Sequence, residues 1–89
     1  MNTNKISQGQ LQNIVVKSLE NNDIRKAIAA CRQLNSEFPA YFEGWYIAGV
    51  IHLRLNKPLA GLVSTERALA LQPNEPRITL QKIEFLLAT

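Results

Sequence analysis

Two side chains of this sequence could take part in nucleophilic or acid–base chemistry, a cysteine at position 31 and a histidine at position 52, and each is the only residue of its type. The carboxylates are scattered, and none stands at a spacing that demands a metal ion or a general acid and base. A reactive thiol needs a positive charge or a helix N-terminus nearby, whereas Cys31 lies among apolar residues of a predicted helix. His52 lies on the apolar stripe of another predicted helix. We interpret both as packing residues and predict a protein that is not an enzyme and uses no metal or cofactor.

Length and charge narrow the class of protein further. The chain has 89 residues, of which 46% are hydrophobic, which is enough for one packed domain. Ten basic and seven acidic residues give a net charge of +3, but the basic residues are dispersed and only Arg25 and Lys26 are adjacent. Nucleic-acid binding requires clustered basic residues, and a membrane span requires about 20 apolar residues in succession. We therefore expect neither a nucleic acid nor a membrane as a partner. The single cysteine favours a reducing compartment, so we expect a cytoplasmic protein.

Helical periodicity runs through the chain, because apolar residues recur at intervals of three and four. Ser7 and Gln10 form a predicted capping box, and Asp23 and Asn74 are predicted caps of later helices. The predicted fold is all-α with about five helices. The first begins near Ser7 and the second follows Asp23. The third runs from about Tyr41 to Leu55, the fourth from Pro58 to Leu71, and the fifth from Pro76 to the end.

The helix boundaries recur with a fixed spacing. Asn22 and Asn56 are separated by 34 residues, as are Pro39 and Pro73. This is the period of the tetratricopeptide repeat, and the stretch from Phe42 to Pro73 resembles that family in the following residues: Trp45, Ala48, Gly49, Gly61, Ala68 and Pro73. We expect the small pair and Gly61 to let the two helices of a hairpin approach closely.

The resemblance implies a right-handed superhelix of antiparallel helical hairpins in a single domain over residues 7–89. We expect residues 1–6 to form a disordered tail before it. The repeats of the domain would cover residues 8–41 and 42–75, and residues 76–89 would form the first helix of a third repeat. In this family the first helix of each hairpin lines a concave groove that binds a peptide or helix of a partner protein. Transferred by position, the groove residues would be Asn13, Val16, Glu43, Tyr46, Ile47, Val50, Arg54, Arg77 and Gln81.

The last predicted helix is apolar over too wide an arc for a helix that ends a domain. Ile83, Phe85, Leu86 and Leu87 fall within five residues and cannot all point inward. We expect either that the polypeptide continues beyond Thr89 or that two copies associate through these residues as a homodimer. The leading hypothesis is therefore a non-catalytic protein-interaction module. The alternative is an N-terminal segment of a longer bacterial enzyme, such as a transferase, that serves substrate recruitment or dimerisation.

Overall fold

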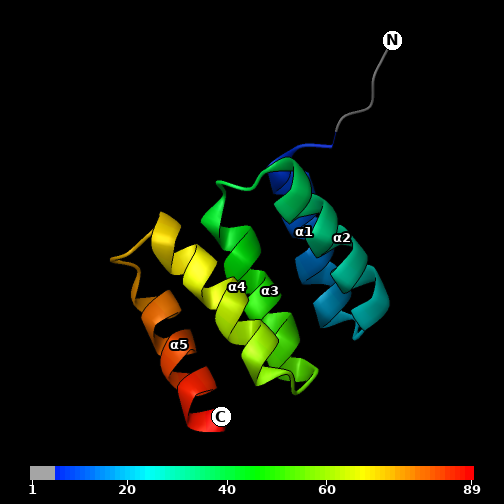
Figure 1. Cartoon of the computed structure of the whole chain (residues 1–89). Helices are drawn as coiled ribbons and strands as arrows, with labels where there is room; N and C mark the ends of the chain where they lie inside the picture. The colour runs from blue at the N-terminus through cyan, green and yellow to red at the C-terminus, as the bar shows by residue number, and fades with distance from the viewer. Residues whose placement is uncertain (1–5) are drawn as a thin grey trace.

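Five helices joined by short turns make up residues 6–89, the part of the chain that the computed structural model describes (Figure 1). They are α1 (Gln8–Glu20), α2 (Ile24–Glu37), α3 (Phe42–Arg54), α4 (Pro58–Leu71) and α5 (Pro76–Ala88). These residues contain no strand, so the predicted all-α class with five helices is confirmed. The tail predicted over residues 1–6 lies outside the described residues, apart from Ile6.

Local side-chain chemistry explains where the helices begin. The Ser7 hydroxyl accepts from the Gln10 amide at 3.2 Å, and the Ser7 amide donates to the Gln10 side chain at 2.8 Å, which forms the predicted capping box. Asp23 caps α2 through the amide of Lys26. The prediction that Asn74 caps α5 is wrong, because the capping residue is Glu75. Proline occupies the first helical position there, so the residue directly before it becomes the cap.

The 34-residue period of the sequence is also a period of the backbone. Asn22 and Asn56 adopt left-handed conformations, with φ of 60° and 56°, and each ends the first helix of a hairpin. The Asn22 amide donates to the Leu19 carbonyl at 3.0 Å. The Asn56 amide donates to the Leu53 carbonyl at 3.1 Å. Asparagine tolerates this conformation better than other residues with a side chain, which explains its presence at both turns.

Each helix packs against the next one in sequence, and α3 also contacts α5. In Figure 1, α2 and α5 lie on opposite sides of the hairpin formed by α3 and α4. One core cluster joins α1, α2 and α3 through side chains that are at most 8% exposed: Val15, Ala27, Ala30, Cys31, Ile47 and Ile51. Across α4 and α5, Phe85 and Ile78 are buried together with Thr65 and Gln81.

Two glycines allow α5 to approach the preceding hairpin. A Cβ atom added at Gly61 would lie less than 3.0 Å from three carbons of the Phe85 ring, and one added at Gly49 would overlap the Gln81 side chain. The prediction that these residues must be small is confirmed, but the predicted partner is wrong. The nearest atoms belong to α5 and not to the other helix of the same hairpin, because the bulky side chains that fill this space come from α5.

Candidate functional site

The residues predicted to line a groove differ in how accessible they are. Asn13, Val16, Arg54 and Arg77 are exposed, and Glu43, Tyr46 and Val50 are partly buried. Ile47 and Gln81, however, are 7% and 3% exposed. Ile47 belongs to the core cluster, and the Gln81 side chain donates to the Tyr46 carbonyl at 2.9 Å and lies 2.6 Å from the Thr65 hydroxyl. These two residues face the interior and cannot contact a partner.

Arg77 connects α5 to α3. Its guanidinium lies 2.9 Å from a carboxylate oxygen of Glu43 and 3.3 Å from one of Glu75, and its Cζ atom lies 5.1 Å from the centre of the Tyr46 ring. Hydrogen bonds to Glu43 and then to Glu75 raise the pKa of Arg77 above its ordinary value. Arg77 and Glu43 thus join two helices that begin successive repeats of the sequence pattern.

Arg54 makes the corresponding link from α3 to α1, since its guanidinium donates to the Leu19 carbonyl at 3.0 Å. Four of the predicted groove residues, Glu43, Arg54, Arg77 and Gln81, therefore have polar partners within the protein. Within residues 6–89, the groove residues that are at least partly exposed and whose side chains make no hydrogen bond or ion pair are Asn13 and Val16 on α1 and Tyr46 and Val50 on α3. We call these four residues the α1–α3 face.

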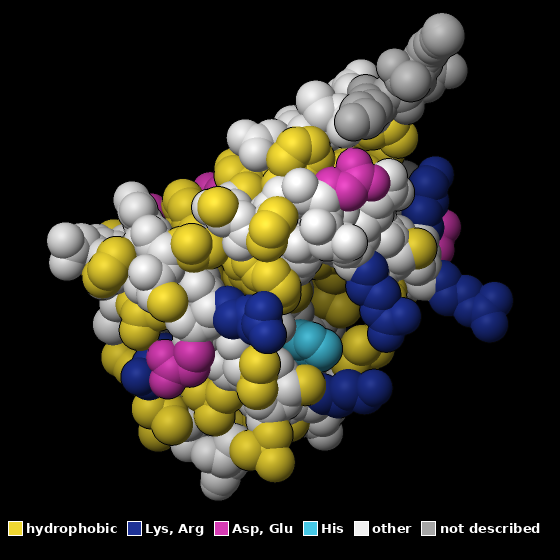
Figure 2. All heavy atoms as spheres, turned by 45° about the horizontal axis from the view of Figure 1, so that its top comes forward, with side chains coloured by type: hydrophobic (Ala, Val, Ile, Leu, Met, Phe, Trp, Pro, Cys, Tyr) yellow, Lys and Arg dark blue, Asp and Glu magenta, His cyan; other side chains and the backbone are white. Residues whose placement is uncertain are grey.

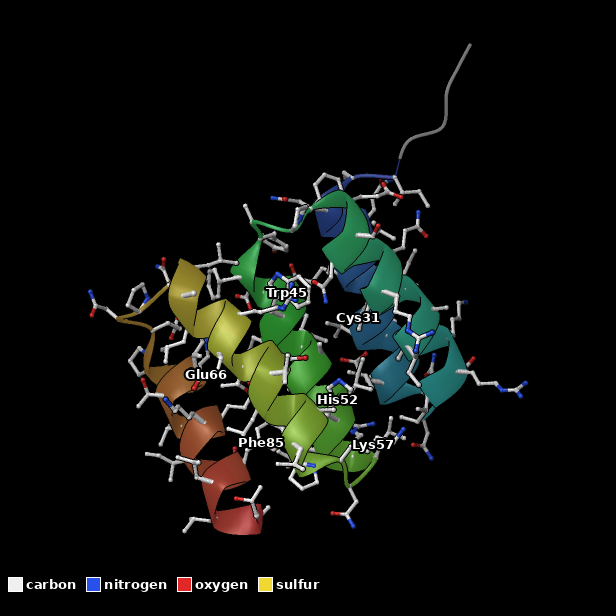
Figure 3. All side chains as sticks on the ribbon, viewed as in Figure 1. Cys31, Trp45, His52, Lys57, Glu66 and Phe85 are labelled. Carbon is white, nitrogen blue, oxygen red and sulfur yellow. The ribbon has the colours of Figure 1, made fainter. Side chains whose placement is uncertain are left out.

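A second surface was not predicted from the sequence. A cleft of about 440 Å³ lies between α2 and α4, with α3 at its floor. In Figure 3, Trp45, His52 and Lys57 follow one another down the space between α2 and α4. The walls and floor of this α2–α4 cleft include Ile28, Cys31, Trp45, Ala48, Ile51 and Ser64.

Basic side chains border the α2–α4 cleft. Arg32 of α2 and Lys57 of the turn before α4 are among its lining residues. Arg67 of α4 covers the Trp45 ring, with 4.8 Å between its Cζ atom and the ring centre. Figure 2 looks onto this face and shows the cyan side chain of His52 among apolar atoms, with Lys and Arg side chains around it. No linear motif marks this cluster, because its members come from three separate segments of the chain.

His52 forms part of the cleft wall and is partly buried. Its Nδ1 atom is buried and has no hydrogen-bond partner among the described residues, and the same is true of Asn35 Oδ1. Burial, and secondly the charge of Lys57, lowers the pKa of His52 below its ordinary value. The sequence placed His52 in the packed interior, whereas the structure places it where the core meets the cleft.

Cys31 is buried, as predicted for a packing residue. Its thiol donates to the Gly44 carbonyl at 3.4 Å, and burial raises the pKa of the thiol to about 11 even though Asn35 donates to the sulfur. The thiol is therefore neutral at physiological pH and a poor nucleophile.

The four residues predicted for self-association do not share one surface. Ile83, Leu86 and Leu87 are 47%, 52% and 83% exposed, but Phe85 is 1% exposed. Phe85 fills the space above Gly61 and cannot contact a second copy. The outer face of α5 consists instead of Ile83, Leu86 and Leu87 together with Leu80, which is 62% exposed.

No three His, Cys, Asp or Glu side chains within residues 6–89 are grouped so that they could hold a metal ion. Within the same range, every helix is too short or too polar to cross a bilayer. Comparison with known proteins found no match to a protein-family model, to a curated protein or to a solved structure.

Proposed function

We propose that this protein is a tetratricopeptide-like interaction module that catalyses no reaction and binds a peptide or helix of a partner protein on its α1–α3 face. The observation that carries the proposal is the 34-residue repetition of the backbone, in which Asn22 and Asn56 form the same left-handed turn with the same hydrogen bond. Repeating helical hairpins of this length build extended surfaces for protein recognition.

The chemistry of the α1–α3 face suits a partner with apolar side chains. Val16 and Val50 occupy equivalent positions of the two repeats, 34 residues apart, and Val16 is 37% exposed. Tyr46 adds an aromatic ring that Arg77 holds in place from α5. Aromatic residues held rigidly beside apolar ones are typical of the residues that dominate binding energy at protein interfaces.

A selection experiment tests this proposal. Peptides selected on the purified protein from a displayed random library should bind Val16→Asp at least tenfold more weakly than the original protein. Val63→Asp is the matched control, because Val63 is 59% exposed on α4 and lies outside the α1–α3 face. Circular dichroism would confirm that both variants fold. If the selected peptides bound Val16→Asp and Val63→Asp equally well, the α1–α3 face would not be the binding surface.

Self-association through α5 is the second part of the proposal. Four apolar side chains, those of Leu80, Ile83, Leu86 and Leu87, are between 47% and 83% exposed on one helix, and a second copy of the chain would remove them from water. Sedimentation equilibrium should show a dimer that Ile83→Glu dissociates and that Leu59→Glu leaves intact, since Leu59 is equally apolar but lies on α4. A monomer at all concentrations would refute this part and leave the α1–α3 face unaffected.

A further inference from the structure

The α2–α4 cleft has an apolar floor of defined length. Ile28 contributes from α2, Ala48 from α3 and Leu55 from the position directly after α3, and Ile51 lies beneath them at 4% exposure. From Trp45 on α3 to Leu55, its C-cap residue, the floor advances by ten residues, which corresponds to roughly 15 Å at the rise of an α-helix. That length accommodates about three turns of a second helix lying between α2 and α4.

The charges at the edge of this cleft are of one sign and lack internal partners. The ion pairs within residues 6–89 engage Arg77 and Lys82, and none of them engages Arg32, Lys57 or Arg67. Arg67 instead stacks on Trp45, which holds its guanidinium at the edge of the cleft. Three unpaired cations around an apolar floor complement a ligand that is apolar on one side and acidic along its margins.

We propose that the α2–α4 cleft binds an acidic amphipathic helix of a partner protein. Its apolar side chains would pack against Ile28, Ala48 and Leu55, which are partly exposed. Its Asp or Glu side chains would pair with Arg32, Lys57 and Arg67. This is the helix-in-groove mode of recognition. It goes beyond the proposed function, because the cleft lies on the other side of α3 from Val50 and takes a partner of different chemistry.

The apolar floor of the α2–α4 cleft favours a protein helix over a nucleic acid as the ligand. Phosphates would satisfy the three cations, but sugars and phosphates offer nothing to the apolar surface of Ile28, Ala48 and Leu55. A single-stranded nucleic acid would need open aromatic rings on which successive bases stack. The cleft lining holds the rings of Trp45 and His52, and Arg67 already covers the Trp45 ring.

Trp45 makes the test direct, because it is the only tryptophan of the chain and lies in the cleft. The probe is a displayed library of amphipathic helical peptides in which each polar position varies among Glu, Gln and Lys. We expect selection on the purified protein to enrich Glu at the positions flanking the apolar stripe. A synthetic copy of the enriched peptide should change the Trp45 emission saturably and shift the amide resonances of Ile28, Ala48 and Leu55.

Matched variants locate the site. Arg32→Glu and Lys57→Glu should each weaken binding of the enriched peptide at least tenfold, whereas Lys17→Glu, the same change in charge on α1, should change it less than twofold. Val16→Asp should leave this binding intact, which separates the cleft from the α1–α3 face. Three results would each overturn the proposal: enrichment of Lys or no enrichment, equal losses in Arg32→Glu and Lys17→Glu, or an oligothymidylate that displaces the peptide and binds more tightly.

Discussion

Replacing Gly61 by alanine adds one methyl group at the closest approach of α4 to α5. The new Cβ would lie less than 3.0 Å from three carbons of the Phe85 ring. Phe85 is 1% exposed, so the ring is enclosed on all sides and has little room to move away. Either the ring must leave its position or α5 must separate from α4.

Two opposing effects of Gly61→Ala set the expected change in the free energy of unfolding. Alanine is favoured over glycine inside a helix by about 1 kcal/mol, which stabilises the variant. Overpacking a core costs about 1–3 kcal/mol, and contact with three ring atoms at once places this substitution near the upper end. The net loss in the free energy of unfolding should be about 2 kcal/mol, which lowers the Tm of a domain of this size by about 10 °C.

The same substitution at Gly9 is the control. A Cβ there would meet only the Ser7 hydroxyl oxygen, at 4.0 Å, so the helix-propensity term acts alone. Because Gly9 is the second residue of α1, Gly9→Ala should stabilise the protein by no more than about 0.5 kcal/mol. Urea and thermal denaturation followed by circular dichroism at 222 nm measure both variants.

A double variant tests the assigned contact itself. Phe85→Leu shortens the side chain that opposes position 61, so Gly61→Ala should cost at least 1 kcal/mol less in that background than in the original protein. A Gly61→Ala protein that melts at or above the temperature of the parent would refute the close approach of α4 and α5. Additive losses in the double variant would show that the ring of Phe85 is not the obstacle.

Three further predictions concern the turn, the histidine and the thiol. Asn56→Ala should lower the free energy of unfolding by about 1–2 kcal/mol in urea denaturation, because φ is 56° there, while Asn56→Gly should be nearly neutral. Burial and Lys57 hold the pKa of His52 below its ordinary 6.5, so the unfolded chain binds more protons, and the free energy of unfolding should fall as the pH drops from 7.5 to 5.5. His52→Gln should reduce that fall. If the free energy of unfolding of His52→Gln fell as steeply with pH as that of the original protein, His52 would not be the group responsible. Cys31, with a thiol pKa of about 11, should react with a disulfide reagent at pH 8 far more slowly in the folded protein than in urea, and equal rates would show that it is accessible.

The sequence by itself determined most of the secondary structure. Ser7, Asp23 and the prolines act on the backbone within a few residues, so their effect on helix ends is readable without knowledge of the fold. The equivalence of Asn22 and Asn56 was likewise visible in their spacing, because a left-handed turn places a demand on a single residue. The requirement for small residues at Gly49 and Gly61 was also anticipated, although their partner was not.

Tertiary packing alone decided which faces of the helices remain accessible. Position in the repeat predicts that Ile47 and Gln81 line a groove, but in the structure both are buried against neighbouring helices. Successive residues on a helix point about 100° apart, so a small rotation of a helix decides which side chains are buried. Phe85 is buried among three exposed apolar neighbours on α5 for the same reason. The α2–α4 cleft depends on the distance between two helices that do not follow one another in sequence, and its cations are brought together only when those helices pack against α3.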